Sequence, residues 1–245
     1  MEVKLPSTRH SSLINNSGFT LIELMLTVAI SGIIIAAIYA AYISQQRTYL
    51  TQEQVAEMQQ NIRAGLDTMV REIRMAGYDP TSFSGASIVT ALNGHISFTQ
   101  DLNANGVTTD PGEMVDFGFS AAANNDNDRN GIPDLDGDGD GIPDPLPIGR
   151  QTWLGNPNPS GYLPIAENIQ AIEFRYLDST ETVTAIPTNI RSVQISILAR
   201  AGQPDRNFTN TMTYTTASGV SWGPYNDNFR RRLMVTTVQC RNIGL

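Results

Sequence analysis

Residues 19–42 form an almost purely apolar run in which Glu23 is the only charged side chain. An α-helix rises about 1.5 Å per residue, so this run corresponds to a helix of about 36 Å, which is long enough to cross a bilayer. Lys4 and Arg9 precede the run, and no positive charge lies within it. This distribution predicts that the N-terminus is cytoplasmic and that everything after the run folds on the other side of the membrane.

A small residue, Gly18, lies immediately before the apolar run. In a secretory signal peptide, the small-residue cleavage site instead follows a shorter apolar core. Cleavage after Gly18 would remove residues 1–18 and leave the hydrophobic helix on the mature chain. Glu23 is then a carboxylate in a transmembrane segment, where a charged group is costly unless it is paired. We expect its partner to be the free α-amino group of Phe19 on a neighbouring subunit.

This arrangement resembles the N-terminus of the type IV prepilin family. The matching segment is residues 18–24, Gly-Phe-Thr-Leu-Ile-Glu-Leu, followed by Met25 and the long apolar stretch. The resemblance implies that a prepilin peptidase cuts after Gly18 and methylates the new N-terminal residue, Phe19. It also implies that Glu23, the fifth mature residue, serves assembly of a filament.

The helical pattern continues beyond the apolar run. Apolar residues recur at spacings of three and four and form one stripe, namely Val55, Met58, Ile62, Leu66, Met69, Ile73 and Ala76. No proline occurs between Pro6 and Pro80. We therefore predict one helix from Phe19 to about Ala76, with an amphipathic half over residues 44–77 whose apolar face packs on the protein's own head.

After Gly77 the sequence changes to short β-rich segments separated by turns. The expected strands are residues 87–92, 95–99, 114–119, 169–177, 190–198, 212–216 and 233–239. The predicted fold class is α+β, a type IV pilin-like roll in which a long N-terminal helix packs on an antiparallel sheet. The expected organisation is a leader (1–18), a transmembrane helix (19–43), an amphipathic helix (44–77) and a β-rich head (78–245) with an Asp-rich insert (124–147).

The second half of the chain resembles the PilW group of minor pilins and, more distantly, the J-type minor pseudopilins of type II secretion. Residues 166–169 and 172–176 carry this resemblance, together with the closing arginines at 230–232 and the pair Arg241 and Asn242.

Residues 126–144 contain an internal repeat with a period of ten, in the pattern D-x-D-x-[DN]-G-I-P-D. Oxygen-bearing side chains at alternate positions, with glycine at the sixth, are what a calcium loop requires. The backbone carbonyl of the seventh residue would add a further ligand. The expected ligands are Asp126, Asp128, Asn130, Ile132 and Asp134 in the first loop, and Asp136, Asp138, Asp140, Ile142 and Asp144 in the second.

The segment departs from an EF-hand because it lacks a glutamate at the twelfth position and because Pro133 and Pro143 forbid flanking helices. It is more similar to the tandem calcium loops of thrombospondin type 3 repeats. A third loop with fewer charged ligands starts at Asp101 and reaches Asp110. The alternative interpretation is a solvated acidic linker, since runs of acidic residues are often that.

Several functional classes are excluded by composition. Cys240 is the only cysteine, which excludes a disulfide framework, and His10 and His95 are the only histidines, too few for a typical histidine-ligated metal centre. The only lysine is Lys4, and a net charge of −8 argues against binding nucleic acid. The chain shows no nucleophile motif or phosphate loop, so we expect no enzyme.

The sequence thus predicts a PilW-like minor pilin that takes part in initiation and assembly of a type IV pilus from the inner membrane. The resemblance implies other minor pilins, the major pilin, the prepilin peptidase and the inner-membrane assembly platform as partners. It implies a periplasmic head, and later a place in the filament at the cell surface. Two alternatives stay open: a J-type minor pseudopilin of a type II secretion system, and a calcium-dependent adhesin carried by the pilus.

Overall fold

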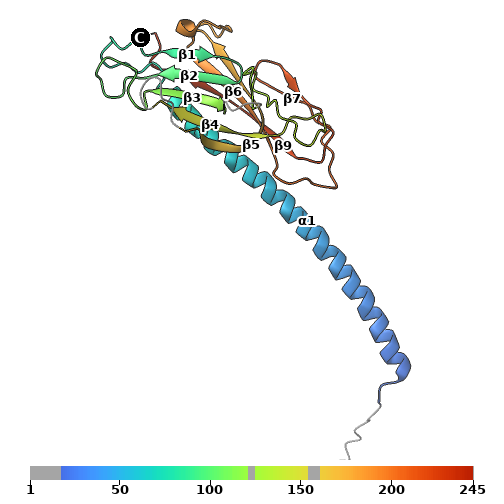
Figure 1. Cartoon of the computed structure of the whole chain (residues 1–245). Helices are drawn as coiled ribbons and strands as arrows, with labels where there is room; N and C mark the ends of the chain where they lie inside the picture. The colour runs from blue at the N-terminus through green and yellow to red at the C-terminus, as the bar shows by residue number, and fades with distance from the viewer. Residues whose placement is uncertain (1–17, 121–124, 154–160, 245) are drawn as a thin grey trace, which may run out of the picture. The chain divides into compact units, whose positions relative to one another are not determined.

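The computed structural model describes residues 18–120, 125–153 and 161–244 (Figure 1). Of the predicted leader, only Gly18 is among the described residues. The chain divides into two compact units, and the boundary between Leu50 and Thr51 lies within one helix, α1 (Leu21–Ile73).

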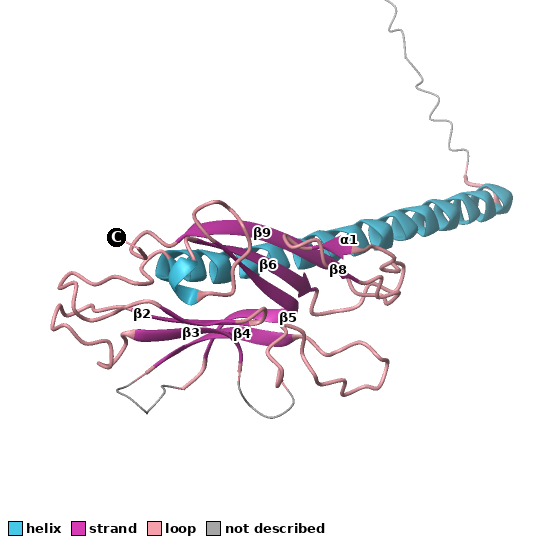
Figure 2. Cartoon of the chain, turned by 90° about the horizontal axis from the view of Figure 1, so that it is seen from above, coloured by secondary structure: helices cyan, strands magenta, loops and turns pink. Residues whose placement is uncertain are grey.

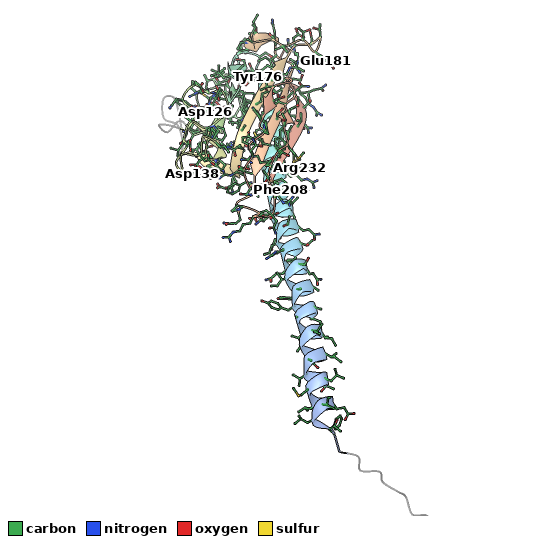
Figure 3. The ribbon with its side chains drawn as sticks, turned by 90° about the vertical axis from the view of Figure 1, so that its right-hand side faces the viewer. Asp126, Asp138, Tyr176, Glu181, Phe208 and Arg232 are labelled. Carbon is green, nitrogen blue, oxygen red and sulfur yellow. The ribbon has the colours of Figure 1, made fainter. Side chains whose placement is uncertain are left out.

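The first unit spans Met1–Leu50, and apart from half-buried Ile43 the large apolar side chains of its described part, residues 18–50, are exposed. Figure 3 shows these side chains projecting from the helix. The most apolar stretch of α1 has a mean hydropathy of 2.5, and none of it is buried. By length and composition, α1 is therefore able to cross a membrane.

The second unit begins with the remaining part of α1, which contributes one buried face to the core. The buried apolar residues of this face are Met58, Ile62, Leu66, Met69 and Ile73, as the sequence pattern predicts. The helix ends at Ile73, three residues before the expected end. Beyond Ile73 the chain forms tight turns, with the Ala76 amide donating to the Ile73 carbonyl at 3.1 Å, and Gly77 with a φ of +77° ends the helical geometry.

The rest of the second unit is antiparallel β-structure. The main sheet has the order β1-β2-β3-β4-β5-β6-β9. Its strands are β1 (Ile88–Ala91), β2 (His95–Thr99), β3 (Met114–Phe119), β4 (Leu146–Thr152), β5 (Leu163–Leu177), β6 (Ser192–Arg200) and β9 (Arg231–Gln239). A separate two-stranded ribbon pairs β7 (Tyr214–Thr215) with β8 (Ser221–Trp222), and a short 3₁₀ helix, η1 (Pro187–Asn189), precedes β6. The predicted α+β class, with a long helix on an antiparallel sheet, is confirmed.

The sheet curls so that β2, β3 and β4 lie on one side and β6 and β9 on the other, with β5 between them (Figure 2). The core lies on the face that meets α1 and is built around Phe98, Phe117 and Phe174, which are almost completely buried. Burial of these rings and of the apolar face of α1 is the main force that holds the helix on the sheet.

The long strand β5 changes partner along its length. Residues 163–169 pair with β4, whereas residues 169–177 pair with β6. Where β4 has diverged, the amides of β5 bond to loops instead. The Ile172 amide donates to the Gly131 carbonyl at 2.8 Å, and the Phe174 amide donates to the Asn93 carbonyl at 2.7 Å. The acidic insert is therefore attached to the sheet at this gap.

The strand predictions were correct in part. Strands β2 and β3 have the expected bounds, but β4 and β8 were missed, β5 begins six residues earlier than expected, and β7 is reduced to two residues. Strand β4 contains Pro147 and Gly149, which both disfavour strand structure. The early part of β5 is largely exposed and contains Pro164, so it lacks the alternating apolar pattern that identifies a strand.

Candidate functional site

Gly18 and Phe19 precede α1, and the Phe19 side chain is exposed. The next residues cap the helix. The hydroxyl and the amide of Thr20 both donate to Glu23 Oε2, at 3.1 and 3.2 Å, and the Glu23 amide donates to the Thr20 hydroxyl at 3.3 Å. This is a capping box, which satisfies amides that have no partner inside the helix. The spacing Thr-x-x-Glu is the sequence signature of a capping box. From the sequence we predicted only an assembly role for Glu23.

The first acidic loop, residues 126–134, turns around the carboxylate of Asp126. Its two oxygens accept hydrogen bonds from the amides of Asn130 and Gly131, at 3.0 and 3.1 Å. Asp128 accepts from the Asn130 amide, and the Asn130 side chain accepts from the Ile132 amide. The predicted alternate ligand positions thus lie along one tightly turned segment.

The second acidic loop, residues 136–144, repeats much of this pattern ten residues later. Asp136 accepts from the Gly141 amide at 3.0 Å, Asp138 accepts from the Asp140 amide, and Asp140 accepts from the Ile142 amide. Carboxylate oxygens of Asp136, Asp138 and Asp140 lie within 4.8 Å of one another, and all three residues are exposed.

A carboxylate closes each loop onto its second residue. Asp134 accepts from the Asn127 amide at 2.7 Å, and Asp144 accepts from the Gly137 amide at 2.9 Å. The ninth residue of each repeat, which the sequence predicts as a ligand, thus also closes its own loop.

The third loop, residues 101–110, has the same internal scaffold. Buried Asp101 accepts from the amides of Asn105 and Gly106, at 3.2 and 3.0 Å. Here Glu113 takes the closing role, because it accepts from the Leu102 amide at 2.9 Å. We did not predict a role for Glu113, since its spacing from Asp101 differs from the spacing in the two repeats.

The sixth residue of every loop is a glycine with a positive φ: +81° for Gly106, +87° for Gly131 and +82° for Gly141. This region of backbone conformation strains any residue with a side chain. Gly131 also lies against the sheet, where an added Cβ would come within 1.9 Å of the Ile172 carbonyl oxygen. Glycine at this position therefore serves both the turn and the attachment to β5.

The first loop is attached to the sheet by a second contact, between Arg129 and His95 at the start of β2. A guanidinium nitrogen of Arg129 lies 2.9 Å from His95 Nδ1. A guanidinium only donates, so Nδ1 accepts and the imidazole is neutral. Burial and the Arg129 charge lower the pKa of His95 to about 4. Burial raises the pKa of Asp126, inside the same loop, to about 6.

The second loop is attached through the Pro143 carbonyl, which accepts a hydrogen bond from the Gln170 side chain on β5. Gln170 in turn accepts from the buried guanidinium of Arg231 at 3.0 Å, and Arg231 pairs with Asp227 at 2.6 Å. Burial lowers the pKa of Arg200 on β6, and the charges of Asp144 and Asp138 in the second loop partly oppose that shift. Figure 3 shows Asp126 and Asp138 along the same side of the head.

The first loop thus brings Asp126 and Asp128 together and the second brings Asp136, Asp138 and Asp140 together, on a segment with one internal arginine, Arg129. Clustered carboxylates repel one another, and a hard cation with oxygen ligands would relieve that repulsion. The backbone amides already fix the side chains that would supply the ligands. This chemistry suits cation binding rather than proton transfer or nucleophilic attack.

Comparisons with known proteins match both ends of the chain. Residues 13–39 match the prokaryotic N-terminal methylation motif, and residues 151–242 match the family of type IV pilus-assembly protein W. Curated proteins gave no significant match. Among solved structures, the type IV-like pilin TTHA1219 from Thermus thermophilus is similar, with a TM-score of 0.46 and 13% identity, over 77% of this chain and 100% of that one. The methylation motif contains Gly18, Phe19 and Glu23, and the chain is thus similar to prepilins at its N-terminus and to the type IV pilus-assembly protein W family over residues 151–242.

Proposed function

We propose that this protein is a minor pilin that takes part in initiation and assembly of a type IV pilus from the inner membrane. The observation that carries the proposal is the N-terminal methylation motif, residues 13–39, which includes the start of α1 and much of its apolar part, none of whose most apolar stretch is buried. An isolated soluble protein does not leave such a surface uncovered, whereas a bilayer or a bundle of similar helices covers it. The match to the pilus-assembly W family favours a pilus component.

In this proposal the prepilin peptidase cuts after Gly18 and methylates Phe19. The N-terminus lies in the cytoplasm before cleavage, and the head lies in the periplasm. Glu23 then pairs with the amine of a neighbouring subunit, since an acid in an apolar bundle requires a partner. The pairing partners are other minor pilins and the major pilin, and the role of the chain is structural.

Deletion of the gene in its own organism tests this role. Surface pili are sheared from the cells and the major pilin in the sheared fraction is measured, with secretion through a type II system assayed in parallel. We expect the deletion to reduce the sheared pilin strongly and the intact gene to restore it. Loss of secretion with unchanged piliation would identify a pseudopilin instead, and a deletion without either effect would contradict both assignments.

We also propose that the first and second acidic loops bind calcium and that the ions are structural. Support comes from the repeated loop scaffold, from glycine at each sixth position and from three carboxylates of the second loop within 4.8 Å of one another. The ligands would come from Asp126, Asp128, Asn130, Asp134 and the Ile132 carbonyl in the first loop, and from Asp136, Asp138, Asp140, Asp144 and the Ile142 carbonyl in the second. The third loop has one acid, Asp101, at the alternate positions, so we assign it no ion.

Calorimetric titration of the detergent-solubilised full chain with calcium chloride tests the loops. We expect at least one calcium to bind with a Kd of about 10⁻⁴–10⁻³ M, the range of extracellular modules. Magnesium should bind much more weakly, because it requires a tighter octahedron. Binding to the folded state alone stabilises it by about 1.4 kcal/mol at ten times Kd, so calcium should raise the melting temperature relative to EDTA.

The double variant Asp128→Ala with Asp138→Ala should lose most of the binding heat and most of the calcium-dependent shift in melting temperature. A matched control, Glu167→Ala with Glu181→Ala, removes two exposed acids outside the loops and should behave like the wild type. If the wild type shows no binding heat and melts at the same temperature in calcium and in EDTA, the loops are a solvated acidic segment.

A further inference from the structure

A groove lies beside the C-terminal end of α1, on the second unit, and has a volume of about 580 Å³. The last turns of α1 and the two residues that follow it form one wall, and the segment that follows β9 forms the other. The side chains that line the groove include Asp67, Val70, Arg71, Arg74, Met75 and Arg241.

The two walls are held together by specific contacts. The Asn242 side chain donates to the Arg74 carbonyl at 3.2 Å. Ile243 is buried in the core beside Gly77, where an added Cβ would come within 2.7 Å of the Ile243 side chain. The groove therefore has a fixed shape, set by the end of the helix and the end of the chain's last strand.

The charge of the groove is opposite to that of the chain. Arg71, Arg74 and Arg241 face one acid, Asp67, so the lining carries a net +2 in a chain of net charge −8. Within the described ranges, the three guanidinium groups have no hydrogen bond or ion pair. Elsewhere on the head, arginines are paired with acids at short distances: Arg150 with Glu72 at 2.7 Å, Arg230 with Asp205 at 2.8 Å and Arg231 with Asp227 at 2.6 Å.

We propose that this groove binds an acidic segment of a partner protein. Guanidinium groups bind carboxylates through two parallel hydrogen bonds, and three of them around one groove can engage several acids at once. The volume suits several side chains rather than a single small anion. Half-buried Val70 and exposed Met75 add an apolar surface between the charges, so the segment should carry an apolar side chain beside its acids.

Fluorescence anisotropy tests this with the full chain in neutral detergent and a labelled peptide of three Glu-Leu-Glu-Gly repeats. The double variant Arg71→Gln with Arg241→Gln should weaken binding about tenfold, since it removes two of the three guanidinium groups that pair with the carboxylates of the peptide. The matched control, Arg206→Gln with Arg232→Gln, removes two exposed arginines outside the groove and should bind like the wild type. Raising the salt from about 50 mM to about 500 mM should also weaken binding, because exposed charges are screened.

A matching peptide with Gln in place of Glu should bind much more weakly than the acidic peptide. The proposal is overturned if the two peptides bind alike, or if the groove variant and the control variant have the same affinity. It is also overturned if vesicles of anionic lipid, but not the acidic peptide, bind in a way that depends on Arg71 and Arg241. In that case the groove would contact a membrane surface rather than a protein.

Discussion

Glu23 shows how one residue can have two roles that sequence alone does not separate. In the single chain, its carboxylate accepts two hydrogen bonds from Thr20 and caps α1. In the proposed filament, the same carboxylate pairs with the amine of a neighbouring subunit. The capping role depends on hydrogen bonding, whereas the pairing depends on charge, so the two roles respond differently to substitution.

Two substitutions of Glu23 distinguish the roles. Glu23→Gln keeps a hydrogen-bond acceptor in the capping box and removes the charge, whereas Glu23→Ala removes both. If the charge matters for assembly, both variants should insert in the membrane but reach sheared filaments at a much lower level than the wild type. A Gln variant that assembles normally beside a defective Ala variant would show that the cap, and not the charge, is what assembly needs.

His95 makes the stability of the head depend on pH. Its pKa is about 4 in the folded protein, whereas an unfolded histidine titrates near 6.5. As the pH falls below about 6.5, the unfolded chain binds a proton that the folded chain excludes, so stability is lost down to about pH 4. The largest loss from this group is about 3 kcal/mol.

The variant His95→Gln tests this dependence, because a glutamine carbonyl can accept from Arg129 but does not titrate. Denaturant unfolding of the wild type and the variant is compared at pH 7 and at pH 4.5. We expect the stability difference between the two proteins to shift in favour of the variant at the lower pH. An unchanged difference would mean that burial and the Arg129 charge do not hold His95 neutral in the folded head.

At the scale of elements, a regular apolar pattern and clear turn boundaries made some elements predictable. The apolar stripe of α1 was found because the helix buries one regular face, and β2 and β3 were found because each is a short, almost continuously buried segment between turns. Strand β4 was missed because it is held by its neighbours on both sides despite Pro147 and Gly149. The acidic repeat was visible in sequence, but its attachment to β5 through Gly131 was not, since a gap between diverging strands leaves no local pattern.

The attachment of the first loop can be measured with one pair of glycine variants. Gly131→Ala combines a strained positive φ with a clash against the Ile172 carbonyl, and we expect it to cost about 3 kcal/mol. Gly141→Ala has the same place in the second loop and nearly the same φ, but nothing lies within 4 Å of its added Cβ. It should cost only about 1 kcal/mol.

Thermal unfolding in EDTA compares these variants without any contribution from a bound ion. For a chain of this size, 1 kcal/mol corresponds to about 2–4 °C, so Gly131→Ala should melt at least twice as far below the wild type as Gly141→Ala. Equal shifts would mean that the first loop is no more firmly attached to the sheet than the second.

At the scale of the whole molecule, the two units pose different physical problems. The first unit exposes an apolar helical surface that requires a bilayer or other helices around it. The second unit buries its own core and presents acidic loops and a basic groove to its surroundings. Both family matches fit this division, because the methylation motif falls in the first unit and the pilus-assembly match falls in the second.

The intact mass of the protein extracted from membranes of its own organism tests the assignment most directly. Processing at Gly18 predicts a chain that starts at Phe19 and carries one N-methyl group, with the whole apolar helix retained. A parallel culture without the prepilin peptidase should give only the unprocessed chain. A mature protein that still begins at Met1 in the presence of the peptidase, or one cut beyond Tyr42, would contradict the proposal that the chain is a pilin.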